Sequence, residues 1–148
     1  MERMVTTLQR SSPLPNRRRF GGSVLEMVLV LTILLNLTFG AIEFGYYFFV
    51  KNTMDGAARE GVRASIVAGA ADSNVNTAAD NVLTAAGLTI GQYTITISPD
   101  LSTSPTAGTN MTVTITANWG TVGSGFRPLA IISANKTITT AAVMRKEG

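Results

Sequence analysis

The sequence predicts an α+β protein with a long N-terminal membrane-spanning helix, a second amphipathic helix and a small antiparallel sheet of about three strands. Three observations support this class: an apolar run long enough to cross a bilayer, apolar residues at helical spacing after it, and later segments that alternate apolar residues with threonine. We expect three parts, which are a cytoplasmic leader over residues 1–21, a transmembrane helix over 22–50 and an exported α+β domain over 51–148.

The membrane helix rests on residues 27–42, which contain no charged side chain and are followed by further apolar residues. A spanning helix needs about 20 such residues. Tyr46 and Tyr47, near the far end, suit the aromatic belt of a membrane interface. Five arginines precede the predicted membrane helix at residue 22 and are opposed only by Glu2, so the positive-inside rule predicts a cytoplasmic N-terminus and an exported C-terminal part.

The helical spacing continues beyond the membrane segment, and predicts one helix from about Ser23 to Ala68, with Asp55 and Arg59 as an i,i+4 ion pair. A second helix should follow, with Ser73 as N-cap and Gly87 at the C-cap. Its predicted apolar face consists of Val75, Ala78, Ala79, Val82, Leu83 and Ala86.

Alternating patterns predict half-buried strands over residues 93–98 and 111–117, each with one apolar face and one threonine face. Residues 136–144 should form the last strand. Between them, Trp119 is expected in the core or at a sheet edge, and Pro128–Ile132 as a short helix or a buried loop.

The composition argues against an enzyme, because the chain has no histidine and no cysteine. These residues are the commonest nucleophiles, general bases and zinc ligands, so we expect no catalytic residue, no metal and no cofactor. The basic cluster before the helix lacks interleaved aromatic residues and adjoins a membrane segment, so we expect no nucleic-acid partner.

Glu26 is the first candidate site residue, because an ionised carboxylate is costly at the edge of a bilayer. Cleavage after Gly21 would leave the α-amine of Gly22 about one helical turn from Glu26, and the two groups could neutralise each other within or between subunits. Two alternatives remain open: an interfacial Glu26 without such a role, and a secretory signal peptide cut after Ala41.

Glu43 lies late in the same segment and does not share a helix face with Glu26, so the two are not a catalytic pair. It either sits at the outer headgroup level or contacts a basic group on a partner helix. Gly40 and Gly45 beside it allow close helix approach.

Arg59, Glu60 and Arg63 lie further along the same predicted helix. The two arginines repel each other at i,i+4 unless an acidic group lies against them. Their block is therefore either a solvated helix face or a docking surface for the second helix or a partner subunit.

Three blocks in order, Gly21–Val30, Phe39–Gly45 and Ala57–Arg63, together resemble the TadE-like pseudopilins of tight-adherence (Flp-type) pilus systems. The basic leader, the glycine and Glu26 at the fifth following position also resemble a type IV prepilin leader. Many relatives carry an arginine where this chain has Tyr46. The specific match covers residues 21–63.

The resemblance implies a non-catalytic minor pilin or pseudopilin of the cytoplasmic (inner) membrane, a single-pass protein that acts in pilus assembly and cell adhesion. It also implies these partners: a prepilin peptidase, the major pilin, sibling pseudopilins, the inner-membrane assembly platform and membrane lipid. The alternative is a signal-anchored envelope protein whose periplasmic domain binds a ligand or a surface.

Overall fold

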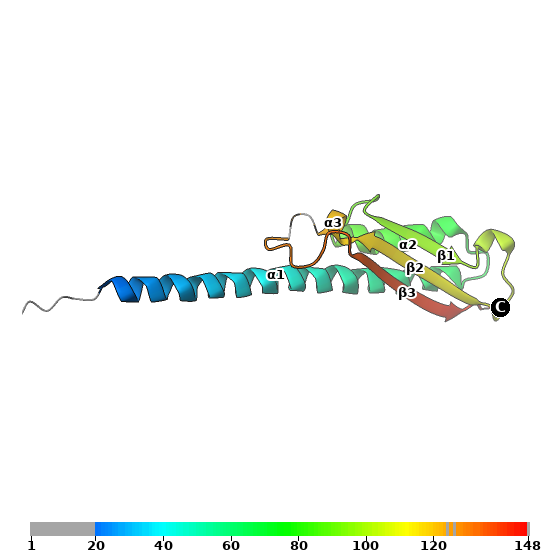
Figure 1. Cartoon of the computed structure of the whole chain (residues 1–148). Coiled ribbons are helices and arrows are strands. Elements are labelled where there is room, and N and C mark those ends of the chain that lie inside the picture. The colour runs from blue at the N-terminus through cyan, green and yellow to red at the C-terminus, as the bar shows by residue number, and fades with distance from the viewer. Residues whose placement is uncertain (1–19, 124, 126, 148) are drawn as a thin grey trace, which may run out of the picture. The chain divides into compact units, whose positions relative to one another are not determined.

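The computed structural model describes residues 20–123, 125 and 127–147. The predicted leader lies outside these residues except for its last two positions. The chain divides into two compact units, Met1–Leu34 and Leu35–Gly148, and one helix runs through both. The elements follow in the order α1 (Phe20–Ser65), α2 (Asp72–Ala85), β1 (Tyr93–Ser98), a 3-10 turn (Leu101–Thr103), β2 (Asn110–Asn118), α3 (Trp119–Val122) and β3 (Thr137–Arg145) (Figure 1).

In the first unit, every residue of α1 from Gly22 to Leu34 is exposed. Leu25 and Met27, for example, are 71% and 72% exposed. By length and composition this helix is able to cross a membrane, with a mean hydropathy of 2.1 over its most apolar window. A helix that is apolar on all sides is stable only when lipid or other helices surround it. The first unit therefore has the character of a membrane anchor.

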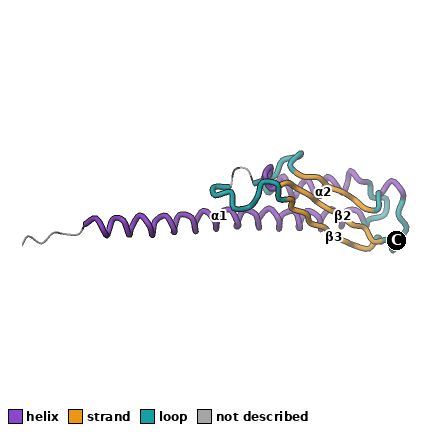
Figure 2. Tube along the Cα trace, viewed as in Figure 1, coloured by secondary structure: helices purple, strands orange, loops and turns teal. Residues whose placement is uncertain are grey.

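The second unit is a two-layer arrangement in which one face of an antiparallel sheet packs against α2 and the later turns of α1 (Figures 1 and 2). The strand order is β1-β2-β3, as expected for an α+β fold with three strands. In β2 the buried residues alternate with half-buried threonines, which confirms the period-two pattern. The buried set is Met111, Val113, Ile115 and Ala117.

The second helix has the predicted face, with Val75, Ala79 and Leu83 fully buried. Its N-terminus differs from the prediction of Ser73, since the N-cap is Ala71, which offers no side-chain hydrogen bond, and the helix begins at the next residue. The prediction failed because the N–H of Asn74 bonds to the carbonyl of Ala71, so the first turn forms two residues early.

The C-terminus of α2 is closed by a Schellman motif. The N–H of Leu88 bonds to the carbonyl of Leu83, and the N–H of Gly87 to that of Thr84. Gly87 has a φ of 88°, in the left-handed region that glycine adopts without strain. The C-cap itself is Ala86, so Gly87 lies one residue beyond the predicted position.

Trp119 is fully buried, so of the two positions expected for it, the core and a sheet edge, the structure shows the core. Its ring lies 5.2 Å from that of Tyr47 and 5.9 Å from that of Tyr46, measured between centroids. Composition alone suggested a membrane interface for these tyrosines, whereas their rings cover the core of the C-terminal domain. A Cβ on Gly123 would lie 2.7 Å from the Trp119 ring, so this glycine is needed for close packing.

The segment Pro128–Ile132 is a loop without helix, and it is only partly buried. We expected a short helix or a buried loop here. The helix is wrong, and the loop is correct except that it is not fully buried. Its residues connect α3 to β3, whose bounds agree within one residue with the predicted strand.

The two layers approach each other closely at Gly61 of α1. A Cβ there would lie 3.3 Å from Cγ1 of Val113 in β2 and 3.5 Å from both Ala79 and Val75 in α2. Gly56, on the same helix, has open space at the equivalent position within the described part of the chain. The two glycines therefore form a matched pair for testing the layer contact.

We expect Gly61→Val to destabilise the protein by about 1–3 kcal/mol, because overpacking a tight contact forces its neighbours apart. Gly56→Val adds the same side chain to the same helix without a steric conflict. Thermal unfolding of the two variants in detergent measures the difference. Equal melting temperatures would show that the layers do not meet at Gly61.

Candidate functional site

All the site residues predicted from the sequence lie on α1, in three groups along its length. The first group is Gly21, Gly22 and Glu26 in the first unit. The second is Gly40, Glu43 and Gly45, and the third is Arg59, Glu60 and Arg63, both in the second unit.

In the first group, Gly22 and Glu26 lie four residues apart within a continuous helix, and therefore on the same helix face. Both are exposed. The helix already includes Gly21, so the predicted cleavage point lies within its first turn. This arrangement leaves Glu26 accessible to an amine on its own chain or on a neighbouring subunit.

Glu43 is the most unusual residue of the second group, because its side chain is fully buried. One carboxylate oxygen, Oε1, accepts a hydrogen bond of 2.9 Å from the backbone N–H of Ile132. The backbone N–H groups of Leu129 and Ile131 and the cation of Arg127 also interact electrostatically with the carboxylate. The other oxygen, Oε2, is buried with no hydrogen-bond partner among the described residues, so the lost hydration of this buried charge is compensated only in part.

Residues 127–132, the Glu43 loop, are fixed to the helix by further contacts. Nη2 of Arg127 donates to the carbonyl of Ile132 at 3.2 Å, so both backbone polar groups of Ile132 are paired with side chains. A Cβ on Gly40 would meet Cδ1 of Ile131 at 3.4 Å. Ala130 has a φ of 51°, a left-handed conformation that alanine rarely adopts.

The structure thus gives Gly40 and Glu43 a partner within their own chain. They lie three residues apart, nearly one turn, and the Glu43 loop covers both. The sequence instead suggested contacts with another helix or with headgroups. Gly45 differs, because no atom of the described residues lies within 4 Å of the position that its Cβ would take.

Next to Gly45, Tyr46 occupies the position at which the resemblance described above led us to expect an arginine. Its hydroxyl donates a 3.3 Å hydrogen bond to the carbonyl of Val122, and its ring lies near Trp119. In this chain the position therefore supports the core of the domain, and Arg127 supplies a cation near Glu43 from the loop.

The third group separates into two faces of one helix. Arg59 pairs with Asp55 at 2.7 Å, as predicted, and Arg63 pairs more loosely with Glu60 at 3.9 Å. The four side chains are between 42% and 74% exposed, so each pair contributes little to stability. The docking surface for the second helix and the sheet lies on the other face, formed by Ala57, Ala58, Gly61 and Val62.

Sequence reasoning missed Arg127 and Ile132 as partners of Glu43. The available signal was a carboxylate within an apolar segment, together with a five-residue apolar loop preceded by an arginine. That signal does not identify the contact, because 89 positions separate Glu43 from Ile132 and the pairing depends on the tertiary fold.

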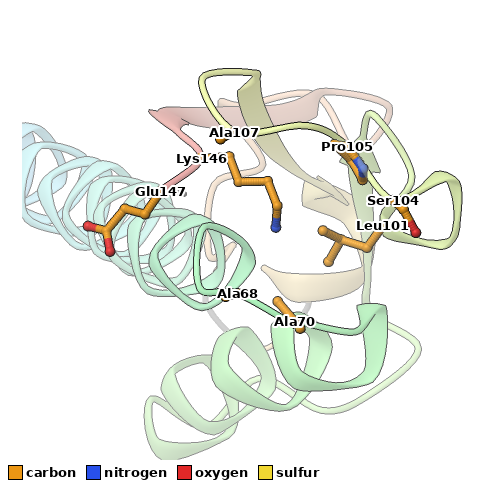
Figure 3. Close-up of a pocket in the computed structure, with 9 residues that line it drawn as sticks. Ala68, Ala70, Leu101, Ser104, Pro105, Ala107, Lys146 and Glu147 are labelled. Carbon is orange, nitrogen blue, oxygen red and sulfur yellow. The ribbon is translucent and has the colours of Figure 1, made fainter.

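A cavity of about 320 Å³ lies at the C-terminal end of α1 (Figure 3). Lys146 extends among the lining residues, whereas the side chain of Glu147 points away from them. The ammonium of Lys146 lies 3.5 Å from the carbonyl of Ser65 and 3.4 Å from that of Val67. Lys146 therefore caps the carbonyl of the last residue of α1 and one carbonyl in the turn after it, a structural role.

Because Glu43 accepts a hydrogen bond from the loop, we expect its replacement to loosen the loop locally. Glu43→Ala leaves the N–H of Ile132 without its acceptor, which costs about 1–3 kcal/mol for a buried donor. We expect faster hydrogen exchange of the Ile132 amide and its loop neighbours, with partial recovery in Glu43→Gln, which keeps an acceptor oxygen. Glu60→Ala, at an exposed carboxylate of the same helix, should leave this exchange unchanged. Unchanged exchange in Glu43→Ala would contradict the contact.

Comparison with known proteins identifies one segment of the chain. The family model described as TadE-like protein matches residues 21–63. No curated protein and no solved structure matches the chain. The matched segment contains all the predicted site residues, and it covers most of α1 from the membrane anchor to the contact with α2. Residues 21–63 are a TadE-like segment, and through it this chain resembles the pseudopilins of tight-adherence pili.

Proposed function

We propose that this protein is a non-catalytic minor pilin or pseudopilin that acts in the assembly of a tight-adherence type IV pilus. The observation that carries the proposal is the first part of α1. Over residues 22–34 it is an exposed helix, apolar on all sides, with a single carboxylate at Glu26, and it belongs to the TadE-like segment. Such a helix needs lipid or neighbouring helices around it, and pilin-type assembly provides both environments.

In this proposal a prepilin peptidase cuts between Gly21 and Gly22, and the new α-amine of Gly22 meets the carboxylate of Glu26. The partners are the major pilin, sibling pseudopilins and the inner-membrane assembly platform. Gly40 and Glu43 hold the chain's own loop, so contacts between subunits are assigned to residues 22–39 and to the open surface at Gly45. The protein resides in the cytoplasmic membrane with its N-terminus inside and its C-terminal domain exported.

Intact-mass measurement of the membrane-purified protein tests the processing step. Coexpression with a prepilin peptidase should remove residues 1–21 and leave Gly22 at the N-terminus. Replacing Gly21 with a bulky residue should retain the full mass. A full-length chain in the presence of an active peptidase favours the signal-anchored envelope protein instead, and a cut after Ala41 indicates a secreted one.

A second experiment addresses Glu26 itself. Glu26→Gln keeps the size of the side chain but removes the charge that would meet the Gly22 amine. We expect normal insertion and cleavage, together with a loss of co-purification with partner pilins. The same change at the exposed Glu60 provides the control. If Glu26→Gln still co-purifies with the partners like the unmodified protein, the amine–carboxylate pairing is wrong.

A further inference from the structure

We propose that the Glu43 loop is a second membrane-contacting element, which places Ile131 in the lipid interface beside the anchor helix. The occupant of this surface is phospholipid. The proposal requires α1 to be a membrane anchor, but it does not depend on pilus assembly or on cleavage by a peptidase.

The first argument comes from the length of the span. A helix rises 1.5 Å per residue, so about 20 residues cross a hydrocarbon layer of about 30 Å. Counted from Gly22, the hydrocarbon layer ends near Ala41. The loop contacts α1 on either side of this position, at Gly40 and at Glu43. The loop is therefore bound to the helix where the chain passes from hydrocarbon to headgroups.

The second argument is the apolar surface that the loop presents. All five residues of Pro128–Ile132 are apolar, and Ile131 is 51% exposed. Single exposed apolar residues are common, but here the neighbouring helix surface is apolar too. Phe39, Ile42 and Phe44 are 39%, 45% and 44% exposed. The loop over residues 99–109, in contrast, is rich in serine and threonine.

The third argument concerns the backbone of Ile132, because a polar group in an apolar interface needs a hydrogen-bond partner. The N–H of Ile132 donates to Glu43, and its carbonyl accepts from Arg127, so both groups have one.

The distribution of the exposed residues favours lipid over a single docked protein. At about 100° per residue, Phe39 and Ile42 lie about 60° apart around α1, whereas Phe44 lies about 140–160° from both, on the other side of the helix. A partner subunit or second copy would cover one side, whereas a fluid apolar phase surrounds the helix and reaches the loop as well.

The experiment uses the full chain, which has no cysteine and therefore accepts a single labelled cysteine without further changes. Ile131→Cys carries an environment-sensitive fluorophore in vesicles of phosphatidylethanolamine and phosphatidylglycerol, with and without lipids that bear a nitroxide quencher, which is shallow for positions 131 and 90 and deep in the acyl chain for Val30→Cys. The matched control is Ile90→Cys, at an isoleucine of the same domain that is 76% exposed. Val30→Cys reports on the anchor, and the fluorescence of the buried Trp119 verifies that each variant is folded.

We expect the fluorophore at position 131 to emit at shorter wavelength and to be quenched several-fold more by the nitroxide lipid than the one at position 90. Equal, weak quenching at 131 and 90 with strong quenching at Val30→Cys overturns the loop proposal and leaves the anchor intact. A blue shift at 131 without lipid quenching means that protein covers the loop, which also overturns it. Absence of quenching at Val30→Cys overturns the anchor as well.

Discussion

The close contact of α1 with α2 and β2, centred on Gly61, is the constraint on which the domain depends. Small side chains at Ala57, Ala58 and Gly61 let α2 and β2 reach the helix at van der Waals distance. The same helix is exposed and apolar in its first part. One continuous helix therefore needs two environments, which are lipid or other helices around its first part and the protein core beside its later turns. The TadE-like segment ends at residue 63, just after this contact. It therefore includes both the exposed apolar part of α1 and the part that packs in the domain.

Between the two halves, Glu43 shows how a charge is accommodated in an otherwise apolar stretch. Its carboxylate is buried, but it accepts a hydrogen bond from the loop backbone and interacts electrostatically with Arg127. Removing one partner of such an arrangement is more disruptive than its net contribution suggests, because the other partner is left desolvated. We interpret Glu43 as the residue that holds the Glu43 loop against α1.

Most of the fold was predictable from the sequence, because local patterns determine it. Alternation with threonine identified β2, and helical spacing identified α2 and the pair of Asp55 with Arg59. Side-chain chemistry alone favoured Ser73 as the N-cap of α2, but backbone bonding places Ala71 there. The partners of Glu43 come from a loop that is distant in sequence, and no periodic pattern encodes such a contact. The candidate site was therefore predictable only as positions on one helix, without the loop that covers them.

The elements that complete the domain lie at the C-terminal end of the chain, which affects the order in which the parts of the protein form. The Glu43 loop, β3 and Lys146, which caps α1, all lie within residues 127–148. Synthesis proceeds from the N-terminus, so the anchor helix exists before any of them. A nascent chain that has not yet reached residue 127 has no cover for Glu43 and no third strand. Until then the carboxylate of Glu43 lacks the contacts that the loop makes with it in the folded domain.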